Sequence, residues 1–387
     1  MIKASFNDHL RTAVLTLAVL AAAAGFKLAL GDRAPANDLE SAVEIMGRTG
    51  LNESEEGEMT AGYYEGLLDG AQQTTKFSRG LLGSLASLKA PPPDWQHSLA
   101  QTQAVHWTAD FMKYDMQPNV DIPFKGDRLQ TNRWGQRDKD YELAKPPATR
   151  RIALIGSSIC MGSGVPLPQT YQALLEDRLN ASGTCPGVER YEIINFSVPG
   201  YMITQLLELS VERAPRFAPD VIILGLNDLA VSSSWCSHIA TLVRAGDDLK
   251  YDFLKDIVAM AHVRPSDSSA RITAKLDPYK LELIEQVIRT IKARCDQVGT
   301  TFVIMNVPFP SQREALKRKL AEVHARITDL QLPVIDALDS FGGRTAEELR
   351  VREWDNHPNA IGHELIFQCV RRGIEADARL RQIIFGC

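Results

Sequence analysis

The stretch Arg151-Ile152-Ala153-Leu154-Ile155-Gly156-Ser157-Ser158 decides the fold of this chain. Residues 152–155 form a short apolar run without alternating polar positions, which is typical of a strand that is buried on both faces of a sheet. A glycine and two serines follow directly, and Gly162 and Gly164 come soon after. A buried strand that runs into a tight turn ahead of a helix indicates a parallel α/β sheet.

The same alternation continues toward the C-terminus. Short apolar runs separated by longer amphipathic segments predict five strands with intervening helices. The expected strands are Arg151–Ile155, Tyr191–Asn195, Val221–Leu224, Thr301–Met305 and Pro333–Ile335, and the expected helices are Gln169–Leu179, Thr204–Arg213, Pro278–Asp296, Ser311–Asp329 and Ala360–Ala376. This pattern predicts an open, doubly wound α/β fold with a five-stranded parallel sheet of the flavodoxin-like kind. Ligands of such sheets bind beyond the carboxyl ends of the strands, so polar clusters at those positions are candidate sites.

The N-terminus has a different composition. Lys3 and Arg11 precede an uncharged run from Thr12 to Phe26, which Lys27 interrupts, and this is the pattern of an export signal. The run is shorter than the ~20 residues that cross a bilayer, although Lys27 can snorkel and lengthen it. We therefore expect residues 1–31 to be either a cleaved signal peptide or an N-terminal membrane anchor; an alanine-rich buried helix is the alternative. Either of the first two places the protein outside the cytoplasm, as a periplasmic, secreted or membrane-tethered protein.

Residues 32–145 are expected to form a separate N-terminal region. The segment Asp38–Leu88 has an amphipathic, helical pattern, and Pro91-Pro92-Pro93 then predicts a stiff, extended linker. Turn residues and scattered aromatics follow, until Pro146-Pro147 marks a second boundary. The α/β domain is accordingly expected to span residues 146–387.

Composition excludes several classes of protein. The chain has 43 basic and 48 acidic residues, a net charge of −5, which argues against a broad electrostatic grip on nucleic acid or anionic membrane. Any membrane contact is expected only through the N-terminal segment. The six cysteines contain no C-x-x-C pair, which disfavours zinc ribbons and thioredoxin-type chemistry and leaves disulfide pairing open. Cys160 and Cys369 lie in apolar stretches and are expected to pack as small hydrophobic residues.

Polar residues follow three of the predicted strands. Ser158 comes after the first strand, at an expected helix N-terminus where free N–H groups favour negative charge; helix capping is the alternative role. The second strand ends in Asn195-Phe196-Ser197-Val198-Pro199-Gly200, whose small residues leave backbone N–H groups accessible. Asn227 follows the third strand and offers a neutral NH₂ donor to a developing oxyanion, with an Asx-turn as the alternative.

A fourth cluster, Trp354-Asp355-Asn356-His357-Pro358-Asn359, lies near the C-terminus. An aspartate two residues before a histidine, in a loop that proline stiffens, can orient the imidazole and stabilise its protonated form. This pair is the base-and-orienter half of a serine triad. A lone loop histidine is more often a surface residue, but here four clusters occur together in one chain order.

The four blocks together resemble the SGNH (GDSL-type) hydrolases. The resemblance implies a role for each of five residues: Ser158 as nucleophile and backbone oxyanion donor, Ser197 as second backbone donor, Asn227 as third donor, His357 as base and Asp355 as its acid partner. It also implies a three-layer α/β/α sandwich, in agreement with the predicted strands. Residues 131–138 resemble a lead-in that precedes the catalytic domain of bacterial members, so the resemblance covers residues 131–376, about two-thirds of the chain.

Three positions depart from the family's pattern. Ser157 stands in place of the aspartate of GDS, and Ser197 replaces a glycine. The acid and the histidine are spaced D-x-H rather than the commoner D-x-x-H. Some relatives that handle acetyl groups on polysaccharides use the shorter spacing, so Asp355 is the expected acid and Glu353 the alternative.

The resemblance implies a serine-dependent ester hydrolase that acts on short-chain or acetyl esters, with acylated cell-surface polysaccharide as a candidate substrate. Such chemistry requires no metal and no organic cofactor. An O-acyltransferase acting on polysaccharide and a noncatalytic binding module of the same fold remain open. The segment between Leu229 and Pro278 shows no strongly apolar lid, which disfavours a lipase, and it is expected to cover part of the site. Nucleotide binding is disfavoured because the glycines after residue 155 do not fit G-x-G-x-x-G.

Overall fold

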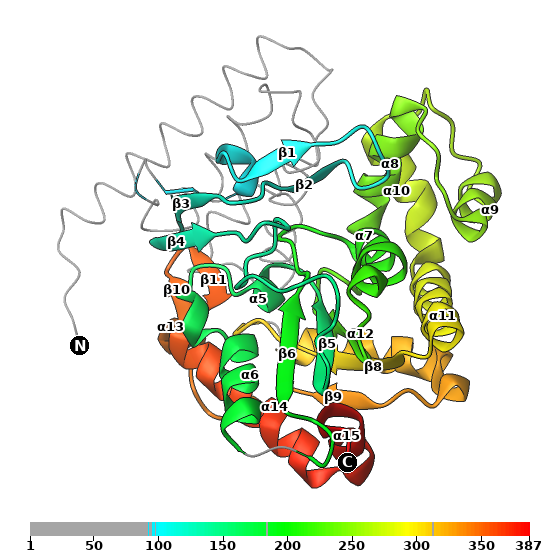
Figure 1. Cartoon of the computed structure of the whole chain (residues 1–387). Helices are drawn as coiled ribbons and strands as arrows, with labels where there is room; N and C mark the ends of the chain where they lie inside the picture. Colours follow the sequence, from blue (N-terminus) through cyan, green and yellow to red (C-terminus); the bar gives the residue numbers. More distant parts are fainter. Residues whose placement is uncertain (1–91, 93–94, 97, 183–184, 312) are drawn as a thin grey trace, which may run out of the picture. The chain divides into compact units, whose positions relative to one another are not determined.

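Five parallel strands form a central sheet in the order β6-β5-β7-β8-β9 (Figure 1). The structure is a computed structural model that describes residues 92, 95–96, 98–182, 185–311 and 313–387. The strands are β5 (Thr149–Ile155), β6 (Arg190–Asn195), β7 (Val221–Leu226), β8 (Thr301–Asn306) and β9 (Val334–Asp336). Each predicted strand lies within two residues of an observed one, and the strand order confirms the predicted flavodoxin-like sheet.

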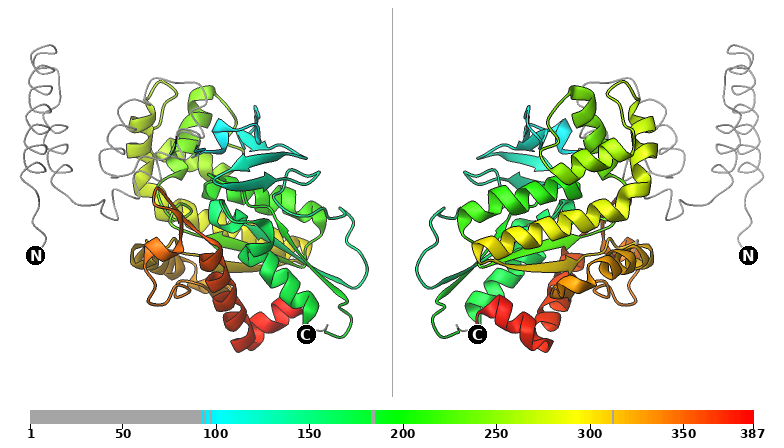
Figure 2. Two further views of the ribbon diagram at one scale, coloured as in Figure 1. Left: turned by 90° about the vertical axis from the view of Figure 1, so that its left-hand side faces the viewer. Right: turned by 90° about the vertical axis from the view of Figure 1, so that its right-hand side faces the viewer.

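Both faces of the sheet are buried, which explains the uninterrupted apolar run in β5. Successive side chains of a strand point to opposite faces. Ala153 and Ile155 accordingly pack into one core, whereas Ile152 and Leu154 pack into the other. Helices α7 (Ile203–Glu208), α11 (Lys280–Val298) and α12 (Arg313–Arg326) complete the first core, and α6 (Tyr171–Ala181), α14 (Ala360–Ala376) and α15 (Ala378–Phe385) complete the second. Figure 2 shows the resulting three layers, with α11 and α14 on opposite sides of the sheet.

The predicted helices are confirmed, and the structure adds others. The predicted bounds of Ala360–Ala376 are those of α14, and α7 continues through a π-helical turn at Leu209–Arg213. The unpredicted helices α8 (Trp235–Ala245), α9 (Asp252–Met260) and α10 (Ser269–Leu276) join the first core. Short elements complete the domain: α5 (Ser158–Met161), α13 (Ala346–Leu349), the antiparallel pair β10 (Arg350–Arg352) and β11 (Asp355–Pro358), and 3₁₀ turns at Leu167–Gln169, Ala214–Phe217, Asp277–Tyr279 and Thr328–Leu330.

Two hairpins precede the sheet in the chain. After a 3₁₀ turn at Leu99–Gln101, β1 (Val105–Trp107) pairs with β2 (Tyr114–Met116), and β3 (Asp121–Phe124) pairs with β4 (Asp127–Gln130). Tyr114 joins the first core, where its ring lies 5.0 Å from that of Tyr201, and its hydroxyl donates to the Pro199 carbonyl at 2.9 Å. The β1–β2 hairpin therefore packs beside the turn that follows β6.

Several expectations concern residues that the structure does not describe. The signal or anchor at residues 1–31 and the helical pattern at Asp38–Leu88 lie outside the described residues, and the domain boundary at residue 146 stays a prediction. Within the described part of the chain, no helix combines the length and the apolar character that crossing a membrane requires.

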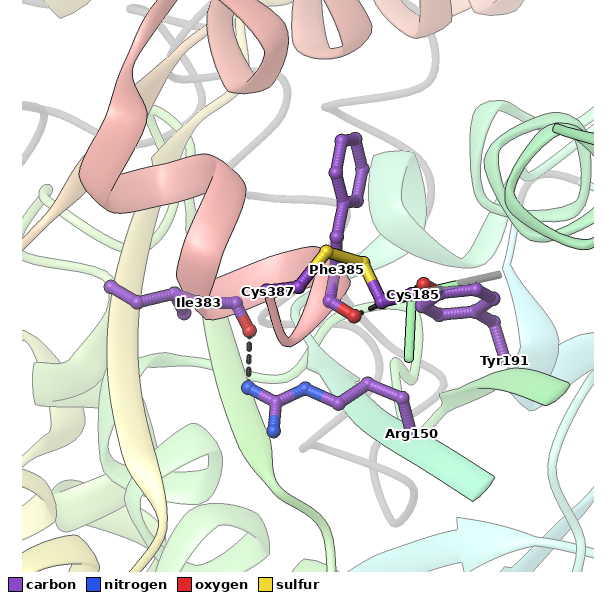
Figure 3. Close-up of a disulfide and its surroundings, with 6 residues drawn as sticks. All are labelled: Arg150, Cys185, Tyr191, Ile383, Phe385 and Cys387. Carbon is purple, nitrogen blue, oxygen red and sulfur yellow. Dashed lines mark hydrogen bonds between the residues drawn. A yellow bond between two sulfur atoms is a disulfide. The ribbon is translucent and has the colours of Figure 1, made fainter. Parts of the chain in front are cut away.

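A disulfide ties the C-terminus to the loop before β6. Cys387 is bonded to Cys185, and Figure 3 shows the adjacent contacts of α15 with the sheet. The Arg150 guanidinium donates to the Ile383 carbonyl, and the Tyr191 hydroxyl donates to the Phe385 carbonyl at 3.0 Å. Among the free cysteines, Cys160 is buried as expected, whereas Cys369 is only partly buried, because it lies on the outer helix α14.

Loss of this disulfide is expected to destabilise the fold. The bond joins cysteines that are 202 positions apart, and closing so long a loop restricts the unfolded chain. We expect Cys185→Ser with Cys387→Ser to lower the free energy of unfolding by about 2–5 kcal/mol. Urea unfolding of this double variant and of wild type, with and without reductant, measures the effect. Equal stability of oxidised and reduced wild type would contradict the prediction, and Cys369→Ser is the control for a cysteine-to-serine change that breaks no disulfide.

Candidate active site

Ser158 opens the one-turn helix α5, directly after β5. The turn is too tight for a side chain at Gly156, where a Cβ would lie 2.4 Å from the Cys160 sulfur. At the other end of the helix, Gly162 adopts a φ of +81°, which favours glycine. The buried guanidinium of Arg137 donates to the carbonyls of Met161 at 3.1 Å and Gly162 at 2.6 Å. Arg137, which belongs to the lead-in segment, thus braces the loop that holds Ser158.

Ser158, His357 and Asp355 form a continuous hydrogen-bonded chain. The Ser158 Oγ lies 2.8 Å from His357 Nε2, and His357 Nδ1 lies 2.5 Å from Asp355 Oδ1. With the Nδ1–H donating to the carboxylate, Nε2 is left to accept from the serine hydroxyl. All three side chains are buried; Ser158 is 0% exposed. The structure therefore brings together the three residues that the sequence predicts as a triad.

The D-x-H spacing has a simple structural cause. Asp355 and His357 were expected in a loop, but they lie in strand β11, which pairs with β10. Residues i and i+2 of a strand point to the same face. The two side chains are therefore neighbours without a turn, and the His357 N–H also donates to Asp355 Oδ1 at 3.1 Å.

A buried lysine completes the cluster, and sequence reasoning missed it. Lys125 lies in the turn between β3 and β4 and is 5% exposed. Its Nζ donates to Asp355 Oδ2 at 2.6 Å and lies 3.3 Å from His357 Nδ1. No motif marks this residue, and the chain separates it from its partners by more than half its length.

The electrostatic setting leaves His357 neutral and Asp355 ionised. Burial lowers the pKa of His357, and the charge of Lys125 lowers this pKa further, while Asp355 opposes both effects without reversing them. Burial raises the pKa of Asp355, but Lys125 and His357 outweigh it and hold that pKa well below its usual range. At neutral pH the imidazole is therefore in the form that can accept a proton from Ser158.

Asn227 follows β7 and lies beside the serine turn. Its Oδ1 accepts from the Ala230 N–H at 3.0 Å, and its Nδ2 donates to the Ser157 hydroxyl at 2.7 Å. These two bonds fix the orientation of the amide. Ser157, which stands where the family has an aspartate, therefore serves here as the acceptor that holds Asn227.

The turn after β6 departs from the expected arrangement. The Ser197 N–H, predicted as an oxyanion donor, donates instead to Asn195 Oδ1 at 3.0 Å. The same Asn195 donates through Nδ2 to the Cys160 carbonyl at 2.9 Å and so ties this turn to α5. Gly200, which ends the turn with a φ of +84°, is buried, and no partner for its N–H occurs among the described residues. The glycine in the sequence block was the available signal for this second candidate donor.

A buried cluster of Asp138, Tyr141 and Glu176 contacts the start of the same turn. Asp138 Oδ2 accepts from the Asn195 N–H at 2.8 Å. The Tyr141 hydroxyl lies between Asp138 and Glu176, 3.3 Å and 2.8 Å from their carboxylate oxygens. Burial and the charge of Glu176 raise the pKa of Asp138 to about 8. Arg137 and Asp138, adjacent in the lead-in, therefore brace the loops after β5 and β6 respectively.

The segment 229–278 makes its described contacts mainly within the first core. In α8, His238 is buried between the Thr204 hydroxyl at 2.8 Å and the Phe111 carbonyl at 2.7 Å, and burial lowers its pKa to about 4. That this segment covers part of the site stays a prediction.

No group of three or more His, Cys, Asp or Glu side chains in the described residues is placed to hold a metal ion.

Comparisons with known proteins add a family and a set of solved structures. Residues 154–365 match the sequence model of the GDSL-like Lipase/Acylhydrolase family, a range that includes Ser158, Asp355 and His357. No curated protein matches the chain significantly. Similar solved structures include TesA, with 13% identity over 58% of this chain and 98% of that one at a TM-score of 0.39. The psychrotrophic esterase EstA from Pseudoalteromonas sp. is 12% identical over 59% of this chain and 97% of its own, with a TM-score of 0.38. A catalytic mutant of the acetylxylan esterase Axe2 from Geobacillus stearothermophilus is 16% identical over 58% of this chain and 94% of its own, also with a TM-score of 0.38.

Proposed function

The chain belongs to the GDSL-like lipase/acylhydrolase family and is a carboxylic ester hydrolase, and we propose that Ser158, His357 and Asp355 are its catalytic residues. One observation carries this proposal: the unbroken chain of hydrogen bonds, 2.8 Å and 2.5 Å long, from the serine hydroxyl through the imidazole to the carboxylate. Nucleophile, base and orienting acid within hydrogen-bond reach are the signature of an activated serine. The neutral state of His357 supports the same roles.

The proposed reaction follows from this geometry. His357 Nε2 takes the hydroxyl proton while the Ser158 Oγ attacks the ester carbonyl, and a tetrahedral oxyanion forms. His357 then gives the proton to the leaving alcohol, and a water molecule, activated in the same way, releases the acid from the acyl-serine. Asp355 orients the ring and stabilises the imidazolium between these steps.

Backbone and amide donors are proposed to stabilise the oxyanion. Two of them are the Ser158 N–H at the start of α5 and the Asn227 amide, which Ser157 holds in place. The third is proposed to come from the turn after β6. Ser197 serves only if its N–H leaves Asn195, whereas the Gly200 N–H requires no such change. A single donor of this kind typically contributes ~10²–10³ in kcat.

The substrate is proposed to be a short acyl ester such as an acetyl ester. Ser158 is 0% exposed, and the Phe309 ring lies edge-on to the His357 ring with the centroids 5.4 Å apart. Burial of the nucleophile beside an aromatic ring favours a small acyl group over a long one. The Cys185–Cys387 disulfide supports an oxidising, extracytoplasmic compartment, where acylated polysaccharide is a candidate substrate.

The wild-type chain tests the function and its two alternatives. We expect turnover of p-nitrophenyl acetate, with kcat/KM at least about tenfold above that for the octanoate ester, and covalent labelling by a fluorophosphonate probe that peptide mass spectrometry locates on Ser158. Absence of both turnover and labelling would indicate a noncatalytic module. Acetylated polysaccharide and a second, unacetylated glycan are then incubated together with the enzyme: free acetate indicates a hydrolase, and a new glycan ester indicates an O-acyltransferase.

A further inference from the structure

Lys125 reaches the proposed triad from outside the part of the chain that matches the family. It lies in the hairpin turn between β3 and β4, which Figure 1 shows next to β10 and β11. The neighbouring Gly126 confirms this proximity, because a Cβ there would lie 3.2 Å from an Arg352 guanidinium nitrogen. The Lys125 ammonium contacts both Asp355 and His357, at 2.6 Å and 3.3 Å. All three residues are buried, with exposed fractions of 5%, 6% and 8% respectively.

The hairpin turn itself is unusual at this position. Phe124 pairs with Asp127, so Lys125 and Gly126 form a two-residue loop, with φ values of +53° and +81°. A loop of this kind requires positive φ at both positions and favours Asn-Gly or Asp-Gly. Lysine is a poor choice for the local backbone. Its presence is explained by where its side chain goes, into the buried cluster.

We propose that Lys125 is a positioning residue for ester hydrolysis, which fixes the outer oxygen of Asp355 and holds His357 in its neutral form. The inference rests on the proposed roles of Ser158, His357 and Asp355. One carboxylate oxygen of Asp355 binds the imidazole and the other binds the ammonium, so the carboxylate is held at both ends. Rotation of Asp355 away from His357 would break a buried ion pair.

The ammonium also offsets the charge of Asp355. A carboxylate beside an imidazole favours the imidazolium form, and a cation beside the same carboxylate reduces this preference. Among the described residues, the charged groups that act on His357 are Lys125, from the β3–β4 turn, and Asp355, from β11. The second histidine near this cluster, His363 on α14, adds no charge: burial, followed by the charges of Arg137 and His357, lowers its pKa to about 3. Removing the charge of Lys125 should therefore make His357 easier to protonate.

The experiment compares two variants of the full chain with wild type. Lys125→Gln keeps a hydrogen-bond donor for Asp355 but has no charge, and Lys125→Arg keeps the charge. Because kcat/KM falls when His357 becomes protonated, its acidic limb reports the histidine pKa. We expect Lys125→Gln to move this limb upward by about one pH unit or more, and Lys125→Arg to leave it near that of wild type.

A matched control and a second measurement complete the test. Lys275, on α10, forms a 2.6 Å ion pair with Asp267. Lys275→Gln therefore removes the charge of another paired lysine without touching the cluster, and it should leave the pH profile of kcat/KM unchanged. NMR titration of His357, assigned with His357→Gln, follows the same pKa without requiring turnover. If the His357 pKa measured by NMR in Lys125→Gln equals that of wild type, the inference is overturned, even when the variant is active. Wild type without esterase activity would overturn the proposed function, while the NMR comparison still decides the role of Lys125.

Discussion

Ser158→Ala is expected to lower kcat for p-nitrophenyl acetate by about 10⁴-fold or more. The substitution removes the atom that is proposed to form the acyl-enzyme, while the proposed oxyanion donors remain. Residual rate enhancement from such donors is well below that of an intact triad. Labelling by a fluorophosphonate probe should disappear together with turnover, because both require the same hydroxyl.

The fold should survive this substitution, and a neighbouring serine provides the control. The Ser163 hydroxyl is buried in the same loop and has no hydrogen-bond partner among the described residues, so Ser163→Ala should leave kcat within about twofold of wild type. Circular dichroism and urea unfolding of both variants separate lost chemistry from lost structure. Wild-type turnover in Ser158→Ala, or an equal loss in Ser163→Ala, would contradict the proposed nucleophile.

The sheet was predictable because its strands are buried on both faces. In β5, all four residues from Ile152 to Ile155 are at most 2% exposed, and such a run has one plain structural interpretation. Helices α8 to α10 were not predicted, although they are amphipathic: all three lie in one long connection between β7 and β8, where no strand separates one helix from the next. The hairpins β1–β2 and β3–β4 were missed because their strands are only three or four residues long.

The candidate site was predictable where a motif carries it and not elsewhere. Ser158 and Asn227 lie in short blocks that follow predicted strands, and Asp355 and His357 lie in a block near the C-terminus. The structure joins Ser158, His357 and Asp355 by hydrogen bonds and places Asn227 against the neighbouring Ser157. The hydrogen bond from the Ser197 N–H to Asn195 Oδ1 depends on the side-chain conformation of Asn195, which the sequence spacing does not predict. The contact of Lys125 depends on how a hairpin docks against β11. Tertiary contacts of this kind leave no local pattern in the sequence.

Asp355→Asn is expected to lower kcat by about 10⁴-fold near neutral pH. The carboxylate accepts from His357 Nδ1, which leaves Nε2 to accept the serine proton. An amide NH₂ at the same place would donate to Nδ1 and put the ring proton on Nε2, which is the wrong tautomer for a base. Lys125 would then be a buried cation without its carboxylate, so a lower urea midpoint is also expected. Activity is therefore compared per folded molecule, with the folded fraction taken from circular dichroism.

Glu353→Gln is the matched variant, because Glu353 is the other acid that the spacing before His357 allowed. Glu353 lies in the turn ahead of β11 and is exposed, whereas Asp355 is buried against the imidazole. An exposed carboxylate in water has little influence on a buried ring, so Glu353→Gln should change kcat by no more than about threefold. The opposite pattern, a large loss in Glu353→Gln and a small one in Asp355→Asn, would transfer the role of the acid to Glu353. It would also mean that the 2.5 Å contact between Asp355 and His357 is not the one the reaction uses.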